Sequence, residues 1–436
     1  MGGGVPRRVL VVSFRFPPHG GGGVHRVAAF TKYLPRFGWQ PHVLTGPWNP
    51  SRALHDPSVL AKIPDGVPVT RTGHFSTKGV RRIFRRLRLL GLAEAVTPTL
   101  PMMDAGWIPH GYREGMRLLK EESFDLIYSS AYPISSHVVA YLLSRRSGLP
   151  WVADYRDEWS IRSVLSWPTA LHRKLARRID KKLIGAADAV ITTSPFHTRT
   201  FGRAFPPTEN QRYVTITNGF DDDDFAGDIP RLSAPPREDR FTLAHVGTFN
   251  AWRDADGLLA ATRRLIEEGR IPADRIELLF VGQTKGLEAT WLRERGILRE
   301  VAYLPHPEAV GTMRAADALL LMNTEVENIL GKTFEYLASG RPMIGLLVEG
   351  ATAELVREAG AGPVLDPGDV DGIAATLAEH FEGWQAGSLR GHANPDVVRR
   401  YSRSETTGRL AEVLDWAVAE HSMKSDSSGV SRTGTR

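Results

Sequence analysis

The sequence of 436 residues contains no cysteine, which excludes disulfide bonds and thiolate metal sites. It also lacks any run of about 18 apolar residues, the length that a membrane-spanning helix requires. The opening MGGGVPRRVLVVSF has no signal-peptide hydrophobic region, because its apolar run is short and leads into a glycine-rich turn. We therefore expect a cytoplasmic protein, and the 42% apolar and 24% charged residues are typical of a soluble globular chain.

Charge is distributed unevenly along the chain. Residues 1–218 contain 31 Lys+Arg and 14 Asp+Glu, a net charge of +17, whereas residues 219–436 contain 24 and 35, a net charge of −11. Such an asymmetry predicts two domains with different partners. The basic half would be attracted to an anionic surface or ligand: a membrane, a phosphorylated acceptor or nucleic acid.

The first half alternates between strand and helix patterns. RRVLVVSF (7–14) predicts a strand, RFPPHGGGG (15–23) a glycine-rich loop, and VHRVAAFTKY (24–33) a helix. This order is typical of a parallel sheet. Further strands are predicted at 41–46, 124–130, 150–156 and 188–194, and further helices at 133–146 and 170–186.

The second half repeats this alternation. A helix is predicted at 254–268, and strands at 240–248, 275–283, 301–305, 318–322, 343–347 and 362–366. The change-over lies near ITNGFDDDDF (216–225). The predicted fold class is α/β, with two doubly wound domains of about 200 residues, which is within the usual domain size.

The stretch EVENILGKTFEYLASGRP (325–342) contains the strongest candidates for functional residues. It reads as a loop and helix between two strands, with Asn328 as a helix N-cap and Gly340 at the helix end. Glu327 would then lie in the loop above the sheet and Glu335 on the helix, near the edge where open α/β sheets bind ligands.

This arrangement suits a nucleotide sugar, although an isolated pair of glutamates is more often a solvated helix face. The helix N-terminus and the Lys332 cation favour a diphosphate, and Gly331 leaves room for it. Glu335 could accept hydrogen bonds from two ribose hydroxyls, and Glu327 from a sugar hydroxyl. If the loop were shifted, Glu325 could take the place of Glu327.

The same stretch resembles the E-x7-E region of retaining family-4 glycosyltransferases, the GT-B superfamily of glycogen synthase and phosphatidylinositol mannosyltransferase. GKTFEYLASGRPMI (331–344) is the most specific piece. Further resemblance lies in the segments at 8–45, LPWVADYRDEW (149–159), ADAVITTSP (187–195), ITNGFDDDDF and HVGTFNAWRD (245–254).

The resemblance implies two Rossmann-like domains that face each other across a cleft. Residues 1–218 would bind the acceptor and 219–395 the nucleotide sugar, a helix over 396–420 would cross back to the first domain, and 421–436 would form a disordered tail. Transfer would retain the anomeric configuration without a metal or other cofactor, since cations and helix dipoles would stabilise the departing diphosphate.

The expected site residues follow from both lines of argument. Arg253 and Lys332 resemble the diphosphate-binding pair of the family, and His137 follows a strand end where it could contact the donor sugar or acceptor. The expected catalytic residues are Glu327, Arg253, Lys332 and His137. The expected donor-binding residues are Gly21, Gly22, Gly23, Arg253, Asn328, Ile329, Leu330, Gly331, Lys332 and Glu335.

Three other sequence features are considered as possible functional sites. The glycine loop departs from G-x-G-x-x-G, because the sixth position from Gly20 is His25, which argues against a dehydrogenase. The run DDDD (221–224) is better explained as a turn after Asn218-Gly219 than as a metal site. Arg156 and Asp157 could form an ion pair in the cleft wall or contact the acceptor.

Residues 78–92, KGVRRIFRRLRLLGL, combine an apolar helical face with flanking arginines. This pattern is typical of a helix lying on an anionic membrane, and equally of a surface helix packed on its own domain. Membrane contact at the inner face would fit a lipid-linked acceptor.

We therefore expect a glycosyltransferase that uses a nucleotide-sugar donor and a lipid-linked saccharide or glycan precursor, in cell-surface polysaccharide assembly. The alternative within this class is glycosylation of a soluble small molecule. A non-hydrolysing sugar-nucleotide epimerase shares the fold but would need no acceptor. A basic nucleic-acid-binding protein is favoured by charge alone, since the sequence shows neither an aromatic platform nor a basic reading helix. The sequence leaves the oligomeric state open.

Overall fold

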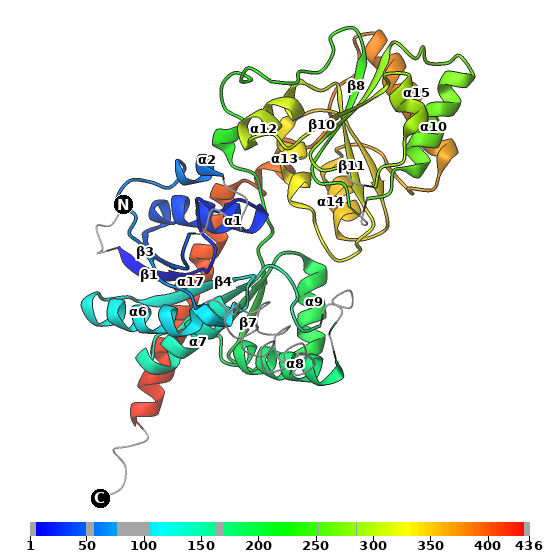
Figure 1. Ribbon diagram of the computed structural model, residues 1–436. Coiled ribbons are helices and arrows are strands. Elements are labelled where there is room, and N and C mark those ends of the chain that lie inside the picture. The colour runs from blue at the N-terminus through cyan, green and yellow to red at the C-terminus, as the bar shows by residue number, and fades with distance from the viewer. Residues whose placement is uncertain are drawn as a thin grey trace, which may run out of the picture. The chain divides into compact units, whose positions relative to one another are not determined.

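The computed structural model describes residues 6–48, 56–75, 104–161, 167, 169–250, 253–284 and 286–430. The chain divides into two compact units, one formed by Met1–Thr217 with Thr406–Arg436 and the other by Asn218–Glu405. Each unit contains a parallel sheet covered by helices on both faces (Figure 1). The α/β class with two doubly wound Rossmann-like domains is therefore confirmed. The segment 78–92 lies outside the described residues.

In the first unit, the described strands form a seven-stranded parallel sheet in the order β3-β2-β1-β4-β5-β6-β7. The order reverses between β1 and β4, which is the switch point where such sheets bind ligands. The strands are β1 (Arg7–Val12), β2 (Trp39–Thr45), β3 (Val69–Arg71), β4 (Leu126–Ala131), β5 (Trp151–Tyr155), β6 (Ala189–Thr192) and β7 (Arg212–Thr215). The short strands β3 and β7 were not predicted, because three or four residues give little periodicity.

Alternate residues of these strands face two different helical layers. Leu10 and Val12 belong to the core under α6, α7, α8 and α9, whereas Val9 and Val11 belong to the core under α1 and α17. The helices are α1 (Gly22–Tyr33), α2 (Pro57–Leu60), α6 (Ile108–Glu121), α7 (Ser135–Ser147), α8 (Ala170–Ile184), α9 (Pro195–Ala204) and α17 (Arg403–Val430), with 3-10 turns η1 (Leu34–Phe37) and η2 (Ala105–Trp107). This two-sided burial explains why the strands are continuous apolar runs.

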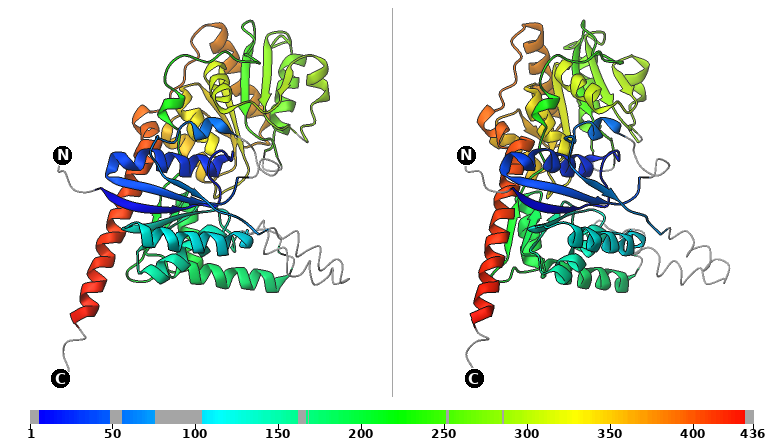
Figure 2. Two further views of the ribbon diagram at one scale, coloured as in Figure 1. Left: turned by 60° about the vertical axis from the view of Figure 1, so that its left-hand side comes forward. Right: turned by 90° about the vertical axis from the view of Figure 1, so that its left-hand side faces the viewer.

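The C-terminal helix α17 lies along the first unit in both views of Figure 2. Its residues Leu410, Leu414 and Ala417 are buried in the core formed with β1 and α1. The helix continues to Val430, so the expectation that disorder begins at residue 421 is corrected. Once a helix is nucleated by packing, each added residue gains one backbone hydrogen bond, which extends it beyond the packed part.

In the second unit, the described strands form a six-stranded parallel sheet in the order β10-β9-β8-β11-β12-β13. These strands are β8 (Phe241–Val246), β9 (Ile276–Val281), β10 (Leu298–Val301), β11 (Ala318–Asn323), β12 (Met343–Leu347) and β13 (Val364–Leu365). The strand predicted at 301–305 begins earlier, because Leu298 pairs with Leu278 of β9 and the chain leaves the sheet after Val301.

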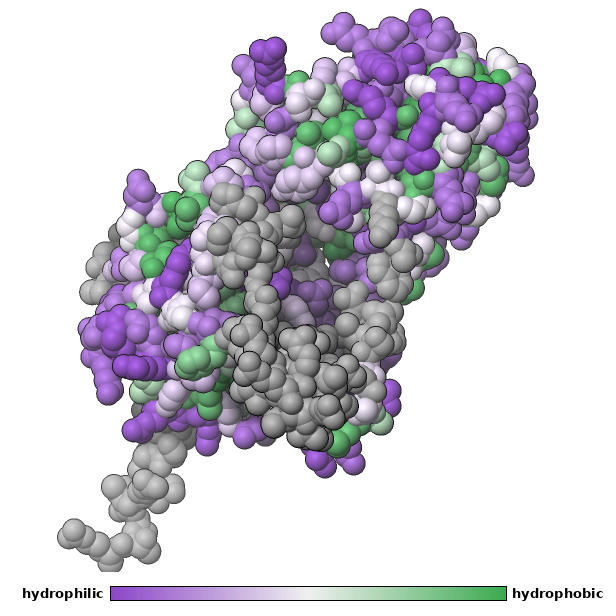
Figure 3. All heavy atoms as spheres, viewed as in Figure 1, coloured by the Kyte–Doolittle hydropathy of each residue, from purple (hydrophilic) through white to green (hydrophobic). Residues whose placement is uncertain are grey.

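Helices cover both faces of this sheet as well. The core that contains Leu243 and Leu320 also contains Leu258 of α10 and Leu377 of α15. The helices are α10 (Asp256–Glu267), α11 (Thr290–Glu294), α12 (His306–Ala315), α13 (Gly331–Ser339), α14 (Ala351–Ala359), α15 (Val370–Gln385) and α16 (Pro395–Arg399), with a 3-10 turn η3 (Asp222–Asp224). On the face shown in Figure 3, hydrophilic side chains predominate and hydrophobic groups are scattered.

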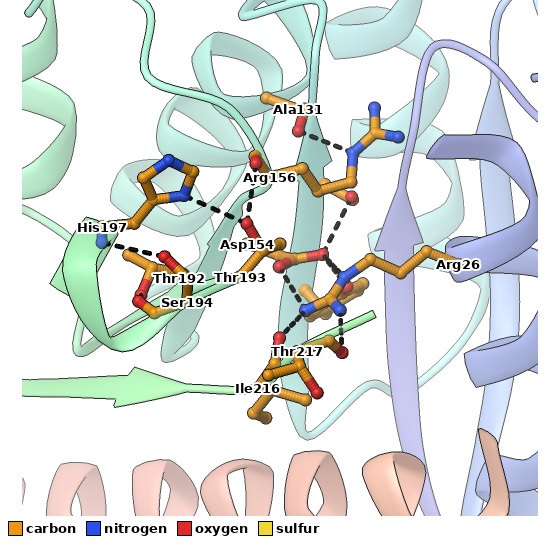
Figure 4. A network of polar contacts seen from close by, with 12 residues as sticks. Arg26, Ala131, Asp154, Arg156, Thr192, Thr193, Ser194, His197, Ile216 and Thr217 are labelled. Carbon is orange, nitrogen blue, oxygen red and sulfur yellow. Dashed lines mark hydrogen bonds and ion pairs between the residues drawn. The ribbon is translucent and has the colours of Figure 1, made fainter. Parts of the chain in front are cut away.

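A fully buried ion pair connects three parts of the first unit (Figure 4). The Arg26 guanidinium of α1 donates two 2.9 Å hydrogen bonds to the Asp154 carboxylate of β5. It also donates to the carbonyls of Ile216 at 2.9 Å and Thr217 at 2.7 Å, where the chain leaves β7. Tyr128 donates its hydroxyl to the same carboxylate at 2.7 Å. Arg26 thereby fixes the glycine-loop helix against the sheet.

Arg26→Met should lower the free energy of unfolding by about 3–5 kcal/mol, because it leaves the Asp154 carboxylate buried without its cation. Asp154→Asn should lower the free energy of unfolding by a similar amount. The double variant should lower it by less than the sum of the two single effects. Urea denaturation of the full chain measures these values. Arg117→Met, which removes an exposed arginine paired with Glu114, is the control and should leave stability nearly unchanged. Strict additivity of the two buried substitutions would contradict the assignment.

Candidate functional site

The candidate site lies in the second unit, at the carboxyl ends of β8 and β11. Here a pocket of about 140 Å³ opens between the loop after β8 and the beginning of α13. Its lining residues are His245, Val246, Gly247, Thr248, Asn250, Arg253, Leu321, Leu330, Gly331, Lys332 and Tyr336. Four of the expected site residues, Arg253, Leu330, Gly331 and Lys332, therefore line one pocket.

Helix α13 begins at Gly331, with Leu330 as its N-cap and no side chain capping its free N–H groups. The expectation that Asn328 caps this helix is corrected, because the loop remains extended for two more residues. A Cβ atom on Gly331 would meet nothing within 4 Å, so the helix end opens onto free space. Gly340 ends the helix in the left-handed conformation, with φ of 67°, as predicted. An uncapped N-terminus beside a pocket favours an anion.

Lys332 and Glu335 lie one turn apart on α13 and form an ion pair, with Nζ and Oε2 separated by 2.5 Å. The Lys332 side chain is 34% exposed and that of Glu335 is 18% exposed. A ligand that bound both residues would therefore replace part of this pair. The spacing of three residues, which was visible in the sequence, is what brings the two charges together.

Arg253 contributes a second cation from the loop after β8. Its Nη1 donates to Asn323 Oδ1 at 3.3 Å. Burial lowers the pKa of Arg253, while the nearby Glu325 carboxylate and Tyr336 raise it, and the side chain remains charged at any physiological pH. Glu325 is thus a loop carboxylate that interacts electrostatically with this arginine.

Asn323 is a central residue that the sequence analysis missed. It ends β11, is 1% exposed, and its Nδ2 donates to the carbonyls of Glu325 at 2.9 Å and Asn328 at 3.3 Å. Its Oδ1 accepts from Arg253, as described above, so one amide holds both the loop and the cation. The only sequence signal was a polar residue ending the apolar run ALLLM.

His245 is a second residue that the sequence analysis did not single out. It lies in β8 and is 5% exposed, and its Nδ1 lies 3.1 Å from the carbonyl oxygen of Leu320. Burial lowers its pKa to about 4, and the Arg253 and Lys332 cations also lower it, whereas the bond to Leu320 raises it. The imidazole is therefore neutral at physiological pH.

Tyr336 connects α13 to the end of β8. Its hydroxyl accepts the Val246 N–H at 2.7 Å, and the side chain is 1% exposed. Its burial raises its pKa well above the ordinary tyrosine value. This bond fixes the distance between the helix N-terminus and the loop that carries Arg253.

The remaining donor-side predictions fall in the loop before α13. Glu327 and Asn328 are partly exposed, and Ile329 is buried. The Asn328 carbonyl accepts a hydrogen bond from Thr352 Oγ1 at 2.8 Å, which holds the loop near α14. The acidic run at 221–224 forms the short turn η3, and its Asp224 lies 2.9 Å from His306 Nε2.

In the first unit, the glycine loop lies against Arg156 (Figure 4 shows this arginine). A Cβ on Gly23 would lie 1.2 Å from Arg156 Nη1, so a larger residue there would require the Arg156 guanidinium to move. Arg156 also donates to the carbonyls of Ala131 and Tyr132 at 2.8 Å. Its neighbour Asp157 is exposed. Gly21, Gly22 and Gly23 therefore precede and begin α1 next to a cation, the second anion-favouring arrangement in the chain.

The structure places His137 in the core of the first unit. The residue is fully buried in α7, its Nδ1 lies 2.8 Å from Ser129 Oγ, and its ring packs 4.3 Å from that of Tyr155. Burial lowers its pKa to about 3. Its Nε2 is buried without a hydrogen-bond partner among the described residues, and its contact with a donor sugar or acceptor stays a prediction.

Asn323→Ala should lower the free energy of unfolding by about 1–3 kcal/mol, because it removes the amide that donates to the Glu325 carbonyl and accepts from Arg253. It should also weaken nucleotide binding, since Arg253 and the loop lose their common support. Urea denaturation and calorimetric titration measure the two effects. Asn394→Ala, which removes only the cap of α16, is the control and should leave nucleotide binding unchanged. Normal binding by Asn323→Ala would contradict the positioning role.

Comparisons with known proteins bear on both units. The sequence model described as "Glycosyl transferase 4-like domain" matches residues 20–219, and "Glycosyl transferases group 1" matches residues 240–382. Together they account for well over half of the chain. No curated protein sequence matches significantly.

Solved structures with the same fold cover nearly the whole chain. A glycosyltransferase from Rickettsia africae is 13% identical, with a TM-score of 0.61 over 94% of this chain and 98% of its own. HepE of Anabaena, in complex with UDP and glucose, is 16% identical, with a TM-score of 0.60 over 94% and 99%. Sucrose-phosphate synthase from Thermosynechococcus elongatus is 15% identical, with a TM-score of 0.53 over 97% and 100%.

Proposed function

Because this chain belongs to the GT-B glycosyltransferases, with both halves matching their sequence models, we propose that it transfers a sugar from a nucleoside-diphosphate sugar to an acceptor hydroxyl. The reaction would proceed with retention of the anomeric configuration, as the resemblance to family 4 implies. The observation that carries the proposal is the pocket of the second unit, in which two cations and an uncapped helix N-terminus converge.

This pocket suits a diphosphate without a metal ion. Arg253 and Lys332 provide two positive charges, and the first N–H groups of α13 provide hydrogen-bond donors. As the sugar–oxygen bond breaks, negative charge develops on the diphosphate, and fixed cations stabilise that charge. We propose that these groups take the place that a metal ion occupies in other transferases.

The two glutamates would bind the remaining parts of the donor, Glu335 the ribose and Glu327 the transferred sugar. Glu335 lies one turn into α13 and is held by Lys332, so a ligand that draws Lys332 to its phosphates frees the carboxylate for two ribose hydroxyls. Glu327 lies in the partly exposed loop before the helix, where it can accept a hydroxyl of the transferred sugar. HepE of Anabaena, which shares the fold, forms complexes with UDP and with UDP-glucose.

The acceptor would bind to the first unit. Support comes from the net charge of +17 in residues 1–218 and from the Arg156 guanidinium beside the glycine loop. We propose a glycan precursor, linked to a lipid, as the acceptor, with the protein held peripherally at an anionic membrane. Among the described residues, no helix has both the length and the apolar character needed to cross a bilayer.

Two alternatives remain distinguishable by experiment. A soluble small-molecule acceptor gives residues 78–92 no reason to bind membranes, so the absence of cosedimentation with anionic vesicles would favour it. A basic nucleic-acid-binding protein would retain an oligonucleotide at physiological salt, where purely electrostatic binding is largely lost.

One nucleoside diphosphate should raise the melting temperature of the wild-type protein in a panel of nucleotides and their sugars, because a ligand that binds the folded state stabilises it. Lys332→Ala should lose this shift, since the diphosphate loses a cation. Arg270→Ala, which removes an exposed cation elsewhere in the second unit, is the matched control and should keep the shift. If no nucleotide shifts the wild-type melting temperature, the donor-site assignment is wrong.

Glu335→Ala should weaken nucleotide binding, whereas Glu327→Ala should mainly lower turnover. Each substitution removes a hydrogen bond to a charged group, which is worth about 1.5–3 kcal/mol. Calorimetric titration with the nucleotide and steady-state kinetics with a glycan acceptor separate the two effects. Glu238→Ala, in an exposed loop of the same unit, serves as control. Wild-type binding and kinetics in both site variants would refute the assignment of the glutamates.

A further inference from the structure

His245 has one ring nitrogen bonded and one directed at the candidate pocket. A backbone carbonyl only accepts hydrogen bonds, so the 3.1 Å contact with Leu320 places a proton on Nδ1 of the ring. In the neutral imidazole, Nε2 then carries a lone pair. This atom is buried and has no hydrogen-bond partner among the described residues. A buried polar atom without a partner is costly, which suggests that a ligand completes its bonding.

The Nε2 atom of His245 lies beside Gly247, which lines the pocket. A Cβ on Gly247 would lie 3.7 Å from His245 Nε2 and 4.0 Å from Lys332 Cγ, so the imidazole and the lysine stem meet beside this glycine. All three residues line the pocket. Because Gly247 has no side chain, no Cβ separates the Nε2 edge of the imidazole from the pocket.

The groups that face the imidazole are cationic or neutral. Arg253 and Lys332 act on it electrostatically, and the Phe280 ring of β9 packs with its centroid 5.5 Å away. From α13, Tyr336 contributes a hydroxyl that is already bonded to Val246. Burial and these neighbours therefore disfavour a charged imidazole, and a negatively charged ligand would favour it.

We propose that His245 takes up a proton from solvent when the diphosphate of the donor binds, and donates Nε2–H to a phosphate oxygen. This inference rests on the proposed function and extends it to a residue that couples donor binding to protonation. A lone pair directed at a phosphate oxygen is repulsive, whereas an imidazolium N–H forms a charge-assisted hydrogen bond with it. The protonated ring uses both nitrogens as donors, one to Leu320 and one to the ligand. The proton returns to solvent when the diphosphate leaves.

The pH dependence of donor affinity follows from the proposed link between donor binding and protonation of His245. The pKa of the free imidazole is lowered to about 4, and the bound diphosphate raises it. Donor affinity should therefore increase as pH falls through the pKa of the complex, and should level off near the pKa of the free site. A nucleotide sugar is a suitable probe, because its diphosphate is a diester and lacks the second phosphate ionisation near pH 6.

The test is calorimetric titration of the full chain at pH 6 with UDP-glucose, or with the nucleotide sugar that gives the largest melting shift. Titrations in two buffers of different ionisation enthalpy give the number of protons bound. The wild type should take up a measurable fraction of one proton, and its affinity should rise by up to about tenfold per pH unit below the pKa of the complex. His245→Gln should take up none and should show a flat pH profile.

His380→Gln is the matched control. His380 in α15 also bonds its Nδ1 to a backbone carbonyl, that of Thr376 at 2.9 Å, and burial also lowers its pKa. It does not line the candidate pocket. This variant should keep the proton uptake of the wild type. His245→Asn, which keeps a donor near Leu320, is the second variant if the glutamine protein is unstable.

The outcomes separate this inference from the proposed function. If the wild type binds the nucleotide sugar without proton uptake, or if His245→Gln takes up as many protons as the wild type, the inference is overturned while the donor site stands. If no nucleotide sugar binds at all, both are overturned. Nitrogen NMR of the wild-type imidazole gives an independent result: Nε2 should gain a proton on ligand addition, and an unprotonated Nε2 in the complex would overturn the inference.

Discussion

The first unit depends on the buried pair between Arg26 and Asp154. One guanidinium connects α1, the sheet strand β5 and the carbonyls at the exit of β7, which are up to 191 residues apart in sequence. A charge in the core is tolerated only when its bonds are satisfied, so this pair admits one arrangement of the three segments. The glycine loop begins the same helix, and its close approach to Arg156 therefore follows from the position of Arg26.

The second unit fixes its site mainly with neutral groups. The amide of Asn323 holds the loop and Arg253, and the hydroxyl of Tyr336 holds the N-terminus of α13 near β8. Two carboxylates balance part of the positive charge: Glu325 interacts electrostatically with Arg253, and Glu335 pairs with Lys332. Burial and, after it, the same cations keep His245 neutral, and the proposed proton uptake would make the charge of the pocket depend on its ligand.

Parallel topology explains why residues so distant in sequence meet at one edge of the sheet. In both units the order of the strands reverses beside the first strand, and the loops that follow neighbouring strands diverge there. Arg253 follows β8 and Glu327 follows β11, and these strands are adjacent although about 75 residues separate them. The chemistry of the protein therefore lies at the carboxyl ends of its strands, the position that open α/β sheets favour.

The sequence by itself determined the alternation of strands and helices and the helix end at Gly340, because both depend on neighbours within a few residues. It did not determine the start of α13, which is at Gly331 and leaves Asn328 in the loop, or the burial of His137. Nor did it identify Asn323 and His245, whose roles depend on contacts with Arg253 and Leu320, 70 and 75 residues away. Local pattern sets local structure, whereas the burial of a side chain and its bonding partners are decided only when distant strands pair.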